Sequence, residues 1–365
     1  MTTPVQQVAP GEAAPVLTQS EVHHDTQQQQ PQKSAAAAAL SPISSTYNRF
    51  MNWRKSLSLG NPGTAEAMGR EAKTTLLSNF IFDGARADLT KGISLNPAFQ
   101  VTHSFALGSQ QSPPNYSFGA VYADAKSFLQ GAVDHTGTLT GRANQSFANL
   151  GTGKVQAQLS EVPGQSMIQL EHDYQGLDYS LNGKAMNPSM IDGTGIYIGS
   201  YLQSLTPNIA LGLETLLQRP QPGVSESLTS YLVRLNGSNR DWLATAQINP
   251  SGMLEATYHH KLSDKVDAAA TLQVINRPQG KEANASLGAK YDFRMASFRG
   301  QLDSTGKVSA LLEQRFTPAF AFLVAGEIDH LKNASKFGVG IMLESTTMTP
   351  EEMNAAMQSV PQPPV

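Results

Sequence analysis

The sequence contains no cysteine, and this absence excludes several kinds of site. A disulfide framework, a thiolate nucleophile and a cysteine-ligated zinc all require that residue. The eight histidines are scattered, and the neighbours His259 and His260 would point to opposite faces of a strand, which is poor geometry for a metal. No GxSxG, HExxH, Walker or GxGxxG motif is present. We therefore expect no catalysis, no metal and no cofactor.

Charge and long apolar runs are also scarce. Charged residues make up 15% of the chain, against about 25% in a typical soluble domain, and the net charge of −3 predicts no nucleic-acid partner. The best apolar run, "PAFAFLVAG" at 318–326, is much shorter than the roughly 18 residues of a membrane helix. A chain poor in charge but rich in glycine and alternating segments is typical of a transmembrane barrel, because only one face of its wall meets lipid.

The N-terminal part differs from the rest in composition. Residues 1–42 are rich in Pro, Gln and Ala and are predicted to be a disordered extension. This end shows no basic-then-apolar signal peptide, and its first basic residue other than histidine is Lys33, so an Arg-rich transit peptide is not expected either. At the other end, residues 346–365 are expected to form a polar, proline-containing tail.

A helical region is predicted over residues 43–79. Aromatic, basic and leucine side chains recur at helical spacing over 47–59 and predict one short helix. "GNPG" at 60–63 ends that helix, and Thr64 is placed to cap a second one that extends through Leu76.

From about residue 80 the apolar period changes from 3.6 to 2. In "KFGVGIMLE" at 336–344, for example, alternate residues from Phe337 to Leu343 are apolar, and the residues between them include two glycines. Strands of about 9 to 11 residues with connections of about 2 to 6 give about 17 to 20 strands over 80–345. An open sheet of that size should close into a barrel. A soluble array of β domains would instead require charged outer faces and domain linkers, and neither is visible.

If the apolar face meets lipid, the alternate positions line a lumen of mixed charge. The acids are Glu171, Asp173, Glu214, Glu255, Asp267, Asp292, Asp303, Glu313 and Glu327, and the bases are Arg142, Lys184, Arg234, Lys261, Lys290, Arg294, Arg299 and Arg315. A selective anion pore is expected to carry a basic excess, whereas mixed charge suits the passage of a heterogeneous, often basic polymer. The alternative is that these residues only solvate a water-filled pore. About nineteen strands leave about 20 to 25 Å between side chains, which admits unfolded or helical polypeptide but not a folded domain.

Several long stretches resemble a known family. They are "GARADLTKGISLNPAFQVTHSFALGS" (84–109), "LEHDYQGLDYSLNGKAMNPS" (170–189), "SYLQSLTPNIALGLETL" (200–216), "AKYDFRMASFRGQLDSTGKVSALLEQR" (289–315) and "GEIDHLKNASKFGVGIMLE" (326–344). They are similar to the fungal form of the central channel subunit of the translocase of the outer mitochondrial membrane, in the mitochondrial porin superfamily. The resemblance covers about residues 42–345. It implies an all-β fold, a nineteen-stranded barrel closed by one parallel pair, with a short N-terminal helix inside the lumen.

The resemblance also implies roles for particular residues. Lys336, Gly338, Ile341 and Leu343 fit the family's membrane-insertion signal, although any last barrel strand could look this way. A receptor subunit is expected near Trp242, which would equally suit an aromatic belt at the membrane surface, and lipid is expected near Lys91 and Arg299. Acidic lumen positions, Asp134, Glu171, Asp173 and Glu327, are candidates for the path of the precursor.

The implied function is a channel that passes unfolded precursor proteins across the mitochondrial outer membrane. Its implied partners are a single-pass receptor subunit, small helical subunits, membrane lipid, further copies of the channel within the complex, and intermembrane-space chaperones that bind the N-terminal tail. The alternative within the same fold is a metabolite pore like the voltage-dependent anion channel, which strong anion selectivity would favour.

Overall fold

The computed structural model describes residues 49, 52–54, 56–57, 59–109, 113–148, 150–162, 164–237, 239, 241–277 and 280–346. The chain divides into two units, residues 1–53 and 54–365, and all the strands belong to the second. The helix expected over 47–59 lies partly outside the described residues, so its extent stays a prediction. The predicted tail at 346–365 lies outside them except for Thr346.

Nineteen strands run through the described residues, and each takes its place in the sheet because its apolar residues alternate with polar or small ones. They are β1 (Gly84–Leu95), β2 (Ala98–Ala106), β3 (Asn115–Ala123), β4 (Ser127–Asp134), β5 (Leu139–Phe147), β6 (Gly151–Leu159), β7 (Met167–Gln175), β8 (Tyr179–Met186), β9 (Gly195–Thr206), β10 (Ile209–Gln221), β11 (Val224–Asn236), β12 (Trp242–Ile248), β13 (Met253–Ser263), β14 (Val266–Arg277), β15 (Gly280–Asp292), β16 (Ala296–Asp303), β17 (Lys307–Thr317), β18 (Phe320–Asp329) and β19 (Ala334–Thr346).

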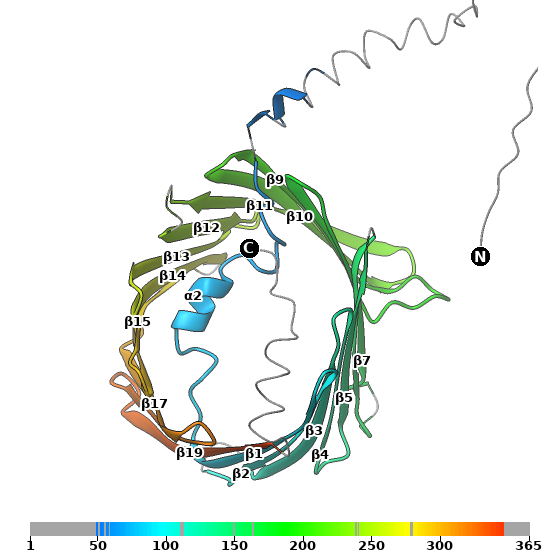
Figure 1. Ribbon diagram of the computed structural model, residues 1–365. Helices are drawn as coiled ribbons and strands as arrows, with labels where there is room; N and C mark the ends of the chain where they lie inside the picture. Colours follow the sequence, from blue (N-terminus) through cyan, green and yellow to red (C-terminus); the bar gives the residue numbers. More distant parts are fainter. Residues whose placement is uncertain are drawn as a thin grey trace, which may run out of the picture. The chain divides into compact units, whose positions relative to one another are not determined.

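The strands form one sheet that closes on itself. Each strand pairs antiparallel with its neighbours in sequence, and β1 pairs in parallel with β19, from Gly84 opposite Gly338 to Gly92 opposite Thr346. An odd number of strands requires one such parallel pair when every connection is a hairpin. Figure 1 shows the resulting ring, with β19 beside β1. The sequence-based prediction of a barrel of about nineteen strands is confirmed.

The two faces of the wall have different chemistry. Large apolar side chains that remain exposed lie at alternate positions, such as Leu170 on β7, Tyr231 on β11 and Phe337 on β19. The residues between them point inward and include Glu171 and Asp173. An apolar outer face around a polar interior is the pattern of a barrel surrounded by lipid.

A short helix, α2 (Arg70–Thr75), lies inside the ring beside β13, β14 and β15 (Figure 1). The predicted helix start at Thr64 was wrong. Thr64 Oγ1 does accept a hydrogen bond from the amide of Ala67, at 3.3 Å, but this closes only a turn. Gly69 adopts a left-handed φ of 70°, which separates that turn from the helix. Among the described residues, no helix is both long and apolar enough to cross a membrane.

Candidate functional site

The interior of the barrel is the candidate functional site, and one segment of the chain crosses it. Residues 59–82, here called the inner segment, lie along the inner wall, with contacts from β6 to β19, before the chain enters β1. Hydroxyl side chains are buried along the inner face, at Ser180, Ser200, Ser204, Ser230, Thr245, Thr257, Ser286 and Ser309. A hydroxyl both donates and accepts hydrogen bonds without adding charge, so this wall can bind backbone groups of the chain laid against it.

The first part of the inner segment is held through its backbone carbonyls. "GNPG" at 60–63 contains two glycines and a proline and forms no helix or strand of its own, so its carbonyls must bond elsewhere. Three of them accept hydrogen bonds from wall side chains: Gly60 from Ser204 Oγ at 2.8 Å, Pro62 from Arg234 Nη1 at 3.0 Å and Gly63 from Ser180 Oγ at 2.5 Å. The wall therefore fixes the path of this stretch through polar contacts.

The second part is held by apolar packing. Ala72 and Leu76, on one side of α2, pack against Ala269 of β14. Leu77 is fully buried between Leu311 of β17 and Ala325 of β18. Burying one leucine side chain stabilises a fold by about 1.5 to 3 kcal/mol.

A glutamine of the wall completes this contact. The amide of Leu77 donates to Gln301 Oε1 at 2.6 Å, and Gln301 Nε2 lies 3.4 Å from Ser78 Oγ. Leu76 is already extended, so the amide of Leu77 does not continue the hydrogen bonding of the helix and requires another partner. The wall thus binds the end of α2 by both apolar and polar contacts.

The last part of the inner segment reaches the closing strands. The guanidinium of Arg299 on β16 lies over the ring of Phe80, 4.3 Å from its centre. Phe82 packs where β19 carries two buried glycines, Gly338 and Gly340. The inner segment is thus anchored at both ends and in the middle.

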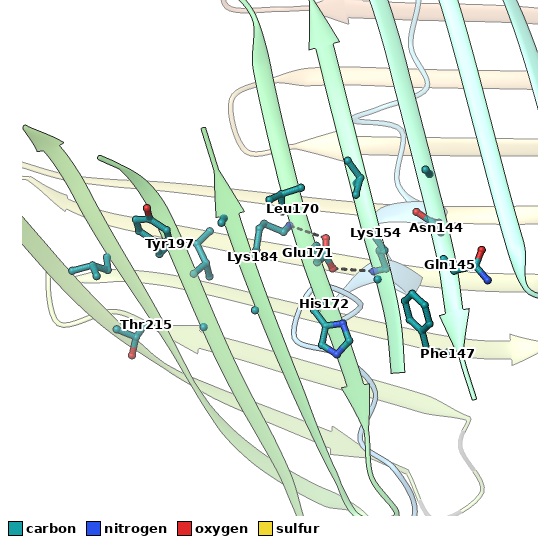
Figure 2. Close-up of a pocket in the computed structure, with 18 of the residues that line it drawn as sticks. Asn144, Gln145, Phe147, Lys154, Leu170, Glu171, His172, Lys184, Tyr197 and Thr215 are labelled. Carbon is teal, nitrogen blue, oxygen red and sulfur yellow. Dashed lines mark hydrogen bonds and ion pairs between the residues drawn. The ribbon is translucent and has the colours of Figure 1, made fainter. Parts of the chain in front are cut away.

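A group of charged side chains meets on β6, β7 and β8. Lys154 Nζ lies 2.9 Å from Glu171 Oε1 and 2.5 Å from Asp173 Oδ2, and Asn182 donates a hydrogen bond to each carboxylate. Lys184 Nζ lies 3.7 Å from Glu171 Oε2. Figure 2 shows Lys154, Glu171 and Lys184 on neighbouring strands, joined by the dashed ion pairs. The exposed fraction is 4% for the Glu171 side chain and 6% for that of Asp173, so the two acids are held beneath the lysines.

The same strands carry a hollow of about 860 Å³ on the apolar side of the wall. In the strand register His172 lies between Gly153 and Gly183, and Gly183 lies opposite Gly199. These glycines leave space between larger side chains such as Phe147 and Leu170. The charged group and this hollow therefore lie on opposite faces of one part of the barrel.

Comparison with known proteins identifies the family. The model of the family described as "Eukaryotic porin" matches residues 61–338. The chain belongs to the eukaryotic porin family. That match begins within the inner segment and ends within β19, so it spans nearly the whole closed ring.

Individual relatives of this porin carry a more specific name. This chain is 39% identical over 334 residues to "Mitochondrial import receptor subunit tom40" of Neurospora crassa, with 88% of this chain and 93% of the relative covered. It is 40% identical over 332 residues to the Saccharomyces cerevisiae protein named "Mitochondrial import receptor subunit TOM40", covering 84% of each chain. A human homologue of that name is 32% identical over 299 residues, with 78% and 79% covered.

The residues predicted as an insertion signal lie along β19 of this porin. Ile341 and Leu343 share the outward face with Phe337, which is 63% exposed, whereas Lys336 and Gly338 point inward. Lys336 Nζ lies 3.7 Å from Glu327 Oε1 on β18. The structure therefore brings together two residues that the sequence predicted for separate roles.

The other predicted positions of this porin are spread around the ring. Trp242 begins β12 and stacks on Tyr258 of β13, which is 42% exposed on the outer face. Lys91 on β1 shares the outer face of Leu89, whereas Arg299 points inward to Phe80. Asp134 ends β4 on the inner face, where its carboxylate accepts hydrogen bonds from the amide and hydroxyl of Thr136.

Sequence reasoning placed one charged side chain wrongly and missed others, of which Lys154 and Glu66 matter most for the charged group on β6–β8. Arg294 was counted as a lumen residue of a strand, but it lies in the connection between β15 and β16. Lys154 was overlooked, although the alternation in "GTGKVQAQL" at 151–159 puts it on the face opposite Val155. Glu66 was also missed, because no local pattern reveals which strands the inner segment will meet.

Proposed function

We propose that this porin is the protein-conducting channel of an import complex in the mitochondrial outer membrane and passes unfolded precursor polypeptides. The observation that carries this proposal is a closed barrel with an apolar outside and an inner wall bearing charges of both signs. The printed names of its relatives, which are mitochondrial import receptor subunits, support the same function. The channel performs no catalysis and needs no cofactor.

The geometry limits what can pass. A barrel of this strand number leaves about 20 to 25 Å between opposing side chains, and the inner segment occupies part of that width. The inner segment contacts β6, β8, β9, β11 and β13–β19. A polypeptide in transit would accordingly run beside the remaining wall, which includes β4 and β5, as an extended chain or a single helix.

The mixed charge of the wall favours polypeptide over small anions. On β6–β8 the two lysines are matched by Glu171 and Asp173, so they do not form an uncompensated basic ring. Rings of unpaired Lys or Arg are what select anions in pores. A metabolite pore like the voltage-dependent anion channel, which shares this fold, would instead show strong anion selectivity.

Assembly of the complex would use the exterior of the barrel and the N-terminal extension. The outward aromatic pair of Trp242 and Tyr258 is the proposed contact for a single-pass receptor subunit, and Lys91, on the outer face, is proposed to lie near bound lipid. Arg299 faces the lumen and contacts Phe80, so its predicted place near lipid gains no support from this contact. Lys336, Gly338, Ile341 and Leu343 would act as the insertion signal. Small helical subunits and further copies of the channel would pack on the apolar exterior. Residues 1–42 would receive intermembrane-space chaperones.

Photo-crosslinking from neighbouring positions tests the conduit role. Gln130 on β4 and Gln156 on β6 are exposed and point inward, and their chain neighbours Leu129 and Val155 are exposed and point outward. A precursor arrested in transit should crosslink to a photoreactive residue at 130 or 156 and not to one at 129 or 155. Equal crosslinking from both members of each pair would contradict the proposal.

A further inference from the structure

Glu66 of the inner segment pairs with the two lysines of the charged group on β6–β8, although Glu66 itself is not part of the wall. Glu66 Oε1 lies 3.2 Å from Lys184 Nζ, and Oε2 lies 4.0 Å from Lys154 Nζ. The other two acids of this group, Glu171 and Asp173, belong to the wall itself. Glu66 is therefore a contact between the inner segment and the wall.

Exposure separates Glu66 sharply from those two acids. Its side chain is 54% exposed, against 4% for Glu171 and 6% for Asp173. A cation moving through the lumen can reach the Glu66 carboxylate directly, whereas Glu171 and Asp173 are screened by Lys154, Lys184 and Asn182. Of the three acids in this charged group, Glu66 is the accessible one.

The charge balance permits Glu66 to change partners. The group holds three carboxylates and two ammonium groups. If Glu66 turns away, Lys154 keeps both Glu171 and Asp173, and Lys184 keeps Glu171. Breaking an ion pair is costly when it leaves a buried charge without a partner. Here every buried charge keeps a partner, so the release of Glu66 should cost little.

The lysines are poorer targets for a ligand than Glu66. The exposed fraction is 23% for the Lys154 side chain and 16% for that of Lys184, and each already contacts a wall carboxylate. An anion would have to compete with those carboxylates, but a cation meets a half-exposed acid. The chemistry therefore favours a cationic ligand.

We propose that Glu66 determines specificity for cationic stretches of the polypeptide in transit, by exchanging its lysine partners for a Lys or Arg side chain of that polypeptide. This inference rests on the proposed function of a protein-conducting channel. Glu171 and Asp173 act differently, since they hold the two lysines in place while Glu66 is engaged elsewhere. The local backbone suits this role, because residues 65–69 form turns between the fixed "GNPG" stretch and α2.

The absence of cysteine from the chain makes a direct test available. Glu66→Cys would be made in the full-length protein, which is then inserted in a planar bilayer. A synthetic amphipathic peptide with several arginines serves as the probe, and the time for which each peptide blocks the current is measured. The thiol is then modified in the inserted channel with an anionic sulfonate reagent or with a cationic trimethylammonium reagent, so folding is complete before the charge is changed.

We expect block times about two- to fivefold shorter in Glu66→Cys than in the natural channel, the range of a partly exposed ion pair. The sulfonate should restore the block time and the trimethylammonium should not. Glu226→Cys is the matched control, because Glu226 is another exposed acid on the inner face, on β11. Modification of the thiol at position 226 should change block times by less than half as much as modification at position 66.

The outcomes separate this inference from the proposed function. Normal block of the natural channel, with equal effects of the two reagents at position 66, would overturn the role of Glu66 and leave the conduit role standing. No block of the natural channel by any cationic peptide would contradict the proposed function itself.

Discussion

Phe82 of the inner segment occupies the space that a side chain at Gly338 of β19 would need. A Cβ built on Gly338 would lie 2.7 Å from Cδ2 of Phe82 and closer still to the Phe82 carbonyl oxygen. Further along the same strand, a Cβ on Gly340 would lie 3.2 Å from the tip of the same ring, and β19 is the strand that pairs with β1 to close the barrel. The finished barrel therefore requires a glycine at 338, independently of any role of that residue in insertion.

Gly338→Ala should destabilise the folded barrel by about 1 to 3 kcal/mol, the usual cost of overpacking, because the carbonyl of Phe82 belongs to the backbone and cannot turn aside. Urea unfolding of the purified, refolded protein in lipid vesicles measures this without the insertion machinery. Gly326→Ala on β18 is the control, since nothing lies within 4 Å of a Cβ there. Equal stability of the two variants would show that Phe82 does not pack on Gly338.

Lys154→Met should destabilise the barrel by about 3 kcal/mol, because it leaves Glu171 and Asp173 buried with a single lysine nearby. Lys261→Met removes a lysine whose partner Asp264 is 96% exposed, so it should change the free energy of unfolding by less than about 1 kcal/mol. Vesicle unfolding of both variants gives the comparison. A loss at Lys261 as large as that at Lys154 would argue against the buried network.

Leu77→Ala should release the inner segment from β17 and β18. The side chain is fully buried, so the expected loss is about 2 to 5 kcal/mol of local packing. We expect a protease added to inserted channels to cut within 59–82 at least several times faster than in the natural protein. Leu177→Ala, at a site 80% exposed between β7 and β8, is the control and should leave the cutting rate unchanged. Unchanged cutting in Leu77→Ala would mean that α2 is held by other contacts.

A photoreactive residue at Trp242 should crosslink to a single-pass receptor subunit in the intact complex, since the ring lies on the outer face against Tyr258. Tyr231, also outward and 56% exposed, is the control and should label mainly lipid. Lipid labelling from both positions would assign Trp242 to the aromatic belt instead.

The wall could be predicted from the sequence, and the path of the inner segment could not. Alternation is a local property, so the outward face of Phe337, Ile341 and Leu343 follows from the spacing alone. The contact of Leu77 with Gln301 joins residues 224 positions apart, and nothing within either stretch specifies the other. Likewise Gly69 has a left-handed φ of 70°, and a Cβ there would come within 3.2 Å of Thr257 on β13, a contact that no pattern near residue 69 reveals.

The candidate site, too, could be predicted from the sequence only in part. The inward position of Glu171 and Asp173 was predictable from strand parity, but the lysine that lies over them comes from a neighbouring strand. Strand pairing sets which side chains meet, and Lys154 lies opposite Glu171 only in the register found here. Burial of these acids thus depends on contacts that a single strand pattern does not reveal.

Passage of an unfolded polypeptide through the purified barrel is the most direct test of the central claim. A precursor is fused to a domain that a small ligand locks in its folded state, and the channel is placed in a planar bilayer or in vesicles. We predict that the precursor crosses without the ligand, and that with the ligand it stalls in the pore and reduces the current. Free passage of small anions, with strong anion selectivity and neither crossing nor block by the precursor, would contradict the account and indicate a metabolite pore.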